Sequence, residues 1–327
     1  MAGAVGLAFP ALAEEALELL NASYDPTREL WRDLNGAFRA KYEAEGGKRL
    51  VIRQSHGGSG SQARAVIDGL AADVVTLALW PDVDAIRKAG LIPEGWEQRL
   101  PNNSVPYVST IVFVVRKGNP KNIRDWADLV RPGVQVITPN PKTSGNGRLS
   151  FLAAWGAVVL RGGSEADARD YVTKLYRNVP VLDTGARGAT TTFVQRGMGD
   201  VHLSWENEAH LEVRESQGGV EIVYPPISIL AEPPVAWVDR VVERKGTRAV
   251  AEAYLRFLFT PAAQEMIAQH YYRPVDRAVL ERYAERFPAL RLFRVQEIVS
   301  GWEAAQEKFF AEGALFDRIF ASGEGQR

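Results

Sequence analysis

The sequence contains no cysteine among its 327 residues. Disulfide bonds, thiolate metal sites and cysteine nucleophiles are therefore excluded, and we expect no lipid anchor built on an N-terminal cysteine. Histidine is scarce as well, with four residues, and no two of them have the spacing of a zinc site. We therefore expect neither a metal nor a cofactor.

An excess of charge of one sign is also missing. Lysine and arginine number 39, aspartate and glutamate number 40, and the net charge is -1. Such a chain has no general positive field for a polyanion, so nucleic acid is not an expected partner. No apolar run reaches the roughly 18 residues that a membrane-spanning helix needs. A small anionic ligand would have to be held by local geometry.

The first residues have a composition of their own. Residues 2–13 read AGAVGLAFPALA, an apolar stretch whose ALA ending fits the small-x-small rule of signal-peptide cleavage. The usual basic segment is missing, because the first arginine is Arg28. We interpret residues 1–13 as a signal-peptide remnant and Glu14 as the mature N-terminus. A short buried helix is the alternative.

Strand-like and helix-like patterns alternate along the chain, which predicts an α/β protein with mainly parallel sheets. A length of 327 residues is long for one core and suits two lobes. The apolar strand TIVFVVR at 110–116 begins the second lobe, and ILAEPPVAWV at 229–238 leads back to the first. We predict two crossovers, with 14–109 plus 232–327 in the first lobe and 110–231 in the second.

Three Gly/Ser/Thr-rich loops recur, each between a predicted strand and a predicted helix. They are QSHGGSGSQ (54–62), NPKTSGNGR (140–148) and TGARGATTT (184–192). The first turn of a helix has unpaired backbone N–H groups, glycine lets the main chain approach a ligand, and hydroxyls add donors. Such a loop holds an anion without a salt bridge. None matches a P-loop or a dinucleotide motif. Because ligands bind beyond the carboxyl ends of parallel strands, we expect the three loops to meet in one cleft.

Nine longer segments carry a family pattern, in unchanged order between about Leu17 and about Arg318. They are SYDPTREL (23–30), QSHGGSG (54–60), DVVTLAL (73–79), STIVFVVRKGNPK (109–121), PGVQVITPNPKTSGNGR (132–148), LAAWG (152–156), DTGARG (183–188), WENEA (205–209) and SILAEPPVAWVD (228–239). This set closely resembles the periplasmic sulfate-binding proteins of ABC importers, and the thiosulfate-binding proteins share most of it. The resemblance implies a type II periplasmic binding protein fold that closes over a dehydrated anion.

The resemblance also implies a ligand site made only of uncharged donors. Carried over position by position, its residues are Asp25 (through its main chain), Ser59, Ser144, Gly145, Asn146, Ala186 and Trp205. One position departs from the family, which usually has glycine where this chain has Asn146. Asparagine accepts left-handed dihedrals better than most residues, so a contact through the backbone N–H tolerates it. If the contact requires the absence of a side chain, the affinity falls.

A site of this kind suits sulfate, which at neutral pH has no proton and only accepts hydrogen bonds. Hydrogen phosphate keeps a proton that such a site leaves unpaired, which costs about 1–3 kcal/mol or more. We expect Ser59 and Ser144 to donate from their hydroxyls and Trp205 from its indole N–H. Backbone N–H groups complete the set. Each side chain also has a structural interpretation, since serines cap helices and tryptophans fill cores.

Three charged or titratable residues near these loops are left out of the predicted site. Arg187 and Lys142 are tempting counter-ions, but the family pattern places no charged side chain on the anion. His56 could sense protons, although a hydrogen-bonded loop histidine is the more ordinary interpretation.

The sequence therefore predicts a binding protein that carries out no chemistry. We expect a periplasmic monomer that delivers sulfate, or thiosulfate, to an ABC permease with its ATPase subunits. One alternative is a carrier for thiosulfate or for a larger oxyanion such as molybdate. A serine hydrolase built on Ser59 and His56 is less favoured, because the G-x-S-x-G elbow is missing. An interaction module without a small ligand is the weakest alternative.

Overall fold

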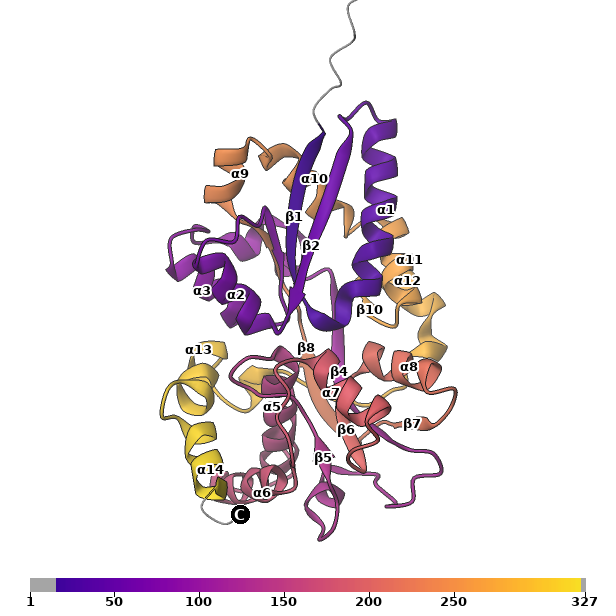
Figure 1. Cartoon of the computed structure of the whole chain (residues 1–327), viewed down its shortest axis with the longest axis vertical. Coiled ribbons are helices and arrows are strands. Elements are labelled where there is room, and N and C mark those ends of the chain that lie inside the picture. Colours follow the sequence, from indigo (N-terminus) through magenta and orange to yellow (C-terminus); the bar gives the residue numbers. More distant parts are fainter. Residues whose placement is uncertain (1–15, 325–327) are drawn as a thin grey trace, which may run out of the picture.

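The computed structural model describes residues 16–324, the side chains of 322–324 excepted, and arranges them around two sheets (Figure 1). The predicted signal-peptide residues 1–13 lie outside the described residues. The first sheet has the strand order β2-β1-β3-β9, in which β1 runs parallel to β2 and β3 while β9 is antiparallel to β3. Its strands are β1 (Leu17–Tyr24), β2 (Leu50–Gly57), β3 (Val74–Thr76) and β9 (Val235–Trp237).

The second sheet has the order β11-β8-β4-β6-β5, and β7 and β10 also pair with β4. Strand β4 runs antiparallel to β6, β7, β8 and β10, whereas the pairs β5–β6 and β8–β11 are parallel. The expectation of mainly parallel sheets is therefore wrong around β4, because the strand that enters this sheet from the first runs against its neighbours. The strands are β4 (Tyr107–Arg116), β5 (Val136–Ile137), β6 (Val201–Trp205), β7 (Val220–Val223), β8 (Ile227–Ala231), β10 (Arg273–Pro274) and β11 (Arg291–Phe293).

Helices pack around both sheets, and each of the longer helices buries at least one of its own faces. Helix α1 buries Leu30, Leu34 and Phe38 at helical spacing, and Thr260 caps α11 through its hydroxyl with Pro261 in the first turn. Among the described residues, no helix is long and apolar enough to cross a membrane. The helices are α1 (Arg28–Ala44), α2 (Ser59–Ile67), α3 (Trp80–Lys88), α4 (Pro101–Ser104), α5 (Gly145–Val159), α6 (Glu165–Arg177), α7 (Ala186–Thr190), α8 (Glu206–Glu215), α9 (Asp239–Lys245), α10 (Arg248–Phe257), α11 (Pro261–Gln269), α12 (Arg277–Arg282), α13 (Trp302–Ala305) and α14 (Leu315–Glu324). Short 3-10 or π turns include η1 (Asp25–Thr27), η3 (Trp126–Val130), η4 (Thr191–Gln195) and η7 (Gln306–Phe310).

The chain passes between the two sheets more than once. Strand β4 begins at Tyr107 in the core of the first sheet, and by Ile111 it lies in the core of the second. The return passage lies between β8 and β9. A third passage, from β9 in the first sheet to β10 and β11, which pair with strands of the second, was not anticipated.

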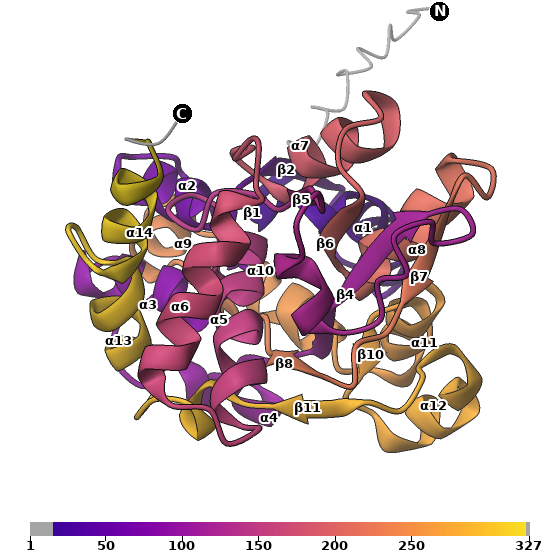
Figure 2. The ribbon, with the colours of Figure 1, turned by 90° about the horizontal axis from the view of Figure 1, so that it is seen from below.

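The C-terminal segment packs on the second sheet. Strand β11 pairs with β8, and Phe293, Phe309 and Phe316 belong to the same core as Ile111. Figure 2 shows α13 and α14 beside α5 and α6. We therefore propose that residues from about 291 onward belong to the second lobe, in place of the predicted assignment of all of 232–327 to the first.

Candidate anion-binding site

The three glycine-rich loops lie against one another. A Cβ atom on Gly58, in the first loop, would lie 2.5 Å from the carbonyl oxygen of Thr143 and 2.9 Å from that of Thr184. Thr143 Oγ1 also donates a hydrogen bond to Thr184 O at 2.8 Å. Only glycine permits this approach, so the loops meet as predicted.

Each loop leads directly into a helix. Helices α2, α5 and α7 begin at Ser59, Gly145 and Ala186 respectively. The first N–H groups of a helix have no intrahelical acceptor, and the helix dipole adds partial positive charge there. Helix α7 has only five residues, so its contribution comes from its free N–H groups more than from its dipole.

The two lobes close tightly over this region. A Cβ atom on Gly145, at the start of α5, would overlap the Cβ of Ala78 from the first lobe, and one on Gly185 would overlap Oδ2 of Asp25. All seven residues of the predicted site are buried. The seven come from η1, α2, α5, α7 and the end of β6.

The two serines of the predicted site have different hydrogen bonds. Ser144 caps α5 by accepting from the N–H of Gly147 at 3.5 Å, which leaves its hydroxyl proton for another acceptor. Ser59 Oγ donates to Asp82 Oδ2 at 2.5 Å and accepts from the N–H of Ala78 at 2.9 Å. Because a hydroxyl has one proton, this arrangement favours the backbone N–H of Ser59, and not the predicted hydroxyl, as its donor to an anion.

Trp205 combines complete burial with an unpaired donor. Its side chain is 0% exposed, its ring lies 5.3 Å from that of Tyr24 in the first lobe, and its indole Nε1 has no acceptor among the described residues. A buried N–H without an acceptor costs free energy, and such groups are rare in folded proteins. An anion that accepts from this N–H removes the cost.

Charged side chains around the site are paired with one another. Arg148 donates to both carboxylate oxygens of Asp82, at 2.6 and 2.8 Å, and both residues are buried. Arg187 lies 3.1 Å from Glu29 and 3.0 Å from Glu208. Burial raises the pKa of Glu208 to about 8, although the positive charge of Arg187 opposes this.

These pairs make the site almost neutral in its side chains. Asp82 and Glu29 belong to the first lobe, and Arg148 and Arg187 to the second, so the pairs also join the lobes. The sequence analysis missed Asp82 and Arg148 because the partners are far apart along the chain. No local motif marks such a pair.

Lys142 and His56, which were left out of the predicted site, have no positive charge available for an anion there. Lys142 donates to Asp317 at 2.9 Å and to the carbonyl oxygen of Phe310 at 3.0 Å, both in the C-terminal segment. Burial, assisted by the positive charge of Arg28, lowers the pKa of His56 to about 4. His56 is therefore neutral at pH 7.

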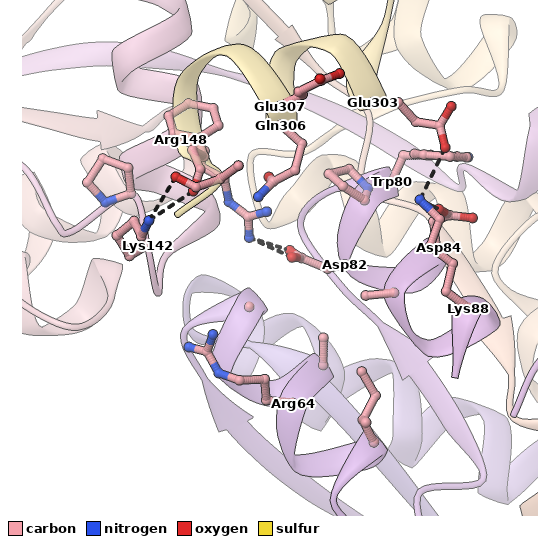
Figure 3. A pocket seen from close by; sticks show the side chains of 18 residues that line it. Arg64, Trp80, Asp82, Asp84, Lys88, Lys142, Arg148, Glu303, Gln306 and Glu307 are labelled. Carbon is pink, nitrogen blue, oxygen red and sulfur yellow. Dashed lines mark hydrogen bonds and ion pairs between the residues drawn. The ribbon is translucent and has the colours of Figure 1, made fainter. Parts of the chain in front are cut away.

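A separate cavity of about 640 Å³ lies beside the Asp82–Arg148 pair (Figure 3). It lies between α2 and α3 on one side and Lys142, Arg148 and the C-terminal turn η7 on the other. None of the seven residues of the predicted site lines it. The cavity is distinct from the anion site, and its lining of both charge signs offers no donors-only environment.

Two α/β lobes that bury hydrogen-bond donors between them have the architecture of a ligand-binding protein. The family model described as bacterial extracellular solute-binding protein matches residues 19–273, and the chain belongs to this family. The predicted fold, the α/β type II periplasmic binding protein fold, is confirmed by the close superposition of a solved sulfate-binding protein.

Individual relatives are similar over nearly their whole length. A sulfate-binding protein of Salmonella typhimurium strain LT2 is 56% identical over 315 residues, which cover 96% of each chain. A thiosulfate-binding protein of Pseudomonas aeruginosa is 50% identical over 320 residues, which cover 97% of this chain and 96% of the other. The solved sulfate-binding protein SubI from Mycobacterium tuberculosis H37Rv superimposes with a TM-score of 0.82 at 34% identity, covering 90% of this chain and 99% of that one.

Proposed function

We propose that this protein captures sulfate between its lobes and delivers it to an ABC importer. Thiosulfate is the second candidate ligand, since relatives that bind each anion are about equally similar. The observation that carries the proposal is the completely buried Trp205 Nε1, a donor without an acceptor beside three converging helix starts. The protein acts as a periplasmic monomer, docks on a permease with ATPase subunits and carries out no chemistry.

The donors explain selection among oxyanions. Backbone N–H groups and the indole N–H only donate, and Ser144 has a free hydroxyl proton. A fully deprotonated dianion satisfies all of them. Hydrogen phosphate would bring its own proton, which an N–H group cannot accept, and an unmade buried bond costs about 1–3 kcal/mol.

A hydrolase is not supported by the hydrogen bonds of Ser59. Its proton goes to Asp82, whose carboxylate is itself bound by Arg148. In the part of the chain that the structure describes, no histidine bonds to Ser59, and His56 Nε2 is without a partner. An activated serine requires an adjacent general base that is free to take its proton.

Calorimetric titration of the protein, stripped of bound anion, tests the proposal. Sulfate, thiosulfate, molybdate and phosphate are added in turn to the wild type and to Trp205→Phe. We expect tight 1:1 binding of sulfate, no heat with phosphate, and a loss of about tenfold to a hundredfold in Trp205→Phe, the range for a hydrogen bond to a charged group. Tight thiosulfate binding would define a shared carrier. A wild type that binds none of these anions would overturn the proposal.

Closure over the ligand has an independent measurement. The ligand donors come from both lobes, so an anion between them stabilises the closed form. Small-angle scattering should show a smaller radius of gyration when sulfate is added to the stripped protein. An unchanged radius would contradict closure on the ligand.

A further inference from the structure

The side chain of Asn146 has an unpaired donor in the same region as the proposed anion site. Asn146 is 1% exposed, and its Oδ1 accepts a hydrogen bond from Ser150 Oγ at 2.9 Å. Its Nδ2 has no acceptor among the described residues. In this orientation Ser150 donates to the amide oxygen, which leaves the NH₂ group without a partner.

Helix geometry places this amide at the cleft end of α5. Asn146 is the second residue of α5, directly after Gly145, which faces Ala78 and Ser59 across the cleft. Successive side chains of a helix differ by about 100° in direction, so Asn146 points away from the tight contact of Gly145. It lies on the same face as Ser150, one turn further along, and α5 packs on β6, the strand that ends at Trp205.

Two buried donors without acceptors therefore come from neighbouring elements, the indole N–H of Trp205 and the amide of Asn146. One ligand that only accepts hydrogen bonds satisfies both. A water molecule would bring its own protons, which N–H groups cannot accept.

We propose that Nδ2 of Asn146 donates a hydrogen bond to the bound anion, as a side-chain donor in addition to the backbone N–H of the same residue. This inference rests on the proposed function and deepens it. A glycine at this position has only a backbone N–H, so Asn146 adds a contact instead of weakening one. The added donor favours fully deprotonated anions and gives no partner to the proton of hydrogen phosphate.

Three substitutions separate the donor from other roles of the side chain. Asn146→Gly removes the amide, and Asn146→Asp keeps an acceptor for Ser150 but replaces the NH₂ group by a negatively charged oxygen. Ser150→Ala keeps the amide and removes only the group that orients it. Sulfate titration of each stripped protein at pH 7 is combined with the melting temperature without ligand.

We expect Asn146→Gly to bind sulfate about tenfold more weakly, the effect of one hydrogen bond to an anion. Asn146→Asp should lose at least a hundredfold, because it places a like charge beside the dianion. Ser150→Ala should lose about threefold. The melting temperatures of the three ligand-free variants should not rank in the same order as their losses of affinity.

Each other result contradicts the inference in a recognisable way. Binding by Asn146→Gly within twofold of the wild type would show that the amide makes no contact with the anion. Losses that follow the ligand-free melting temperatures would show a structural role alone. A wild type that binds no anion would overturn the proposed function and this inference together.

Discussion

Ser144 and Ser59 show that one residue type has two different roles in one cleft. Both precede or begin a helix, and both are buried. Ser144 has a hydroxyl proton to give, whereas the proton of Ser59 is held by Asp82. The side chain of Ser144 is therefore suited to contact the anion, and that of Ser59 is suited to connect α2 with α3.

Ser144→Ala should weaken sulfate binding about tenfold to a hundredfold, because it removes a donor to a charged ligand. Ser59→Ala should weaken it less than fivefold, since the backbone N–H stays. Calorimetric titration measures both. Ser164→Ala is a matched control, because Ser164 caps α6 away from the loops and its loss costs about 1 kcal/mol of stability without a change in affinity. Equal affinity losses in Ser144→Ala and Ser59→Ala would contradict this division.

His56 should make the stability of the ligand-free protein depend on pH. Its pKa is about 4 in the folded protein and about 6.5 in an unfolded chain. Between these values the unfolded chain binds the extra proton, so the contribution of His56 is full above pH 6.5 and is lost as the pH falls toward 4. His56→Gln should flatten this part of the curve of unfolding free energy against pH, measured by urea denaturation. An unchanged slope would show that other groups cause the dependence.

At the scale of elements, the start of α5 decides whether the lobes can close. Its first residues are Gly145, Asn146 and Gly147, and a Cβ on Gly147 would also lie against backbone atoms of residues 139–141. The glycines allow the helix start to approach both the first lobe and its own preceding loop. A side chain at Gly145 would separate the lobes before the donors reach the anion.

Gly145→Ala should therefore weaken sulfate binding at least tenfold, because a Cβ at this position overlaps Ala78 of the first lobe and hinders closure. Alanine within a helix is more favourable than glycine by about 1 kcal/mol, so the ligand-free melting temperature should not fall. Titration and small-angle scattering measure affinity and closure. Wild-type affinity together with wild-type compaction would show that the lobes close less tightly than the structure indicates.

The boundaries of helices and strands were predicted best where an apolar pattern coincides with a residue that favours the start or the end of an element. The apolar pattern at Leu17–Ser23 predicts a strand, which is β1, and the pattern at Arg148–Leu160 predicts a helix, which is α5. The pattern at 179–182 also predicts a strand, but these residues form none. The segment lies beside β5, since Val136 N donates to Asn178 O at 2.9 Å and Asn140 N donates to Asp183 O at 2.8 Å, but it has no regular strand structure. Hydrophobic periodicity does not distinguish these cases.

At the scale of the whole molecule, closure depends on charges as well as on the ligand. The Asp82–Arg148 pair is buried where the lobes meet. Burying two charges is costly unless they stay paired, so the closed form requires both partners. The ligand and the ion pair then stabilise the same state.

Sulfate should raise the melting temperature of the stripped protein in a concentration-dependent way. A ligand that binds only the folded state adds about 4 kcal/mol at a thousandfold excess over its dissociation constant. Differential scanning calorimetry over a sulfate series measures this, with phosphate at equal ionic strength as the control. Equal shifts with both anions would indicate a general salt effect and no specific site.

The sequence by itself determined the family, the class of ligand and the alternation of α/β elements. These properties depend on residue types in short segments, such as the glycine-rich loops and the segment at 132–148, and short segments keep their chemistry wherever they fold. The absence of cysteine likewise excluded thiolate chemistry without any structure.

Only the tertiary structure decided which partners those residues have. It gave the proton of Ser59 to Asp82, paired Arg148 with the same carboxylate, and placed the C-terminal segment on the second sheet. Each of these contacts joins residues that are far apart along the chain. Their formation depends on the closed packing of both lobes, and no local pattern of residues encodes it.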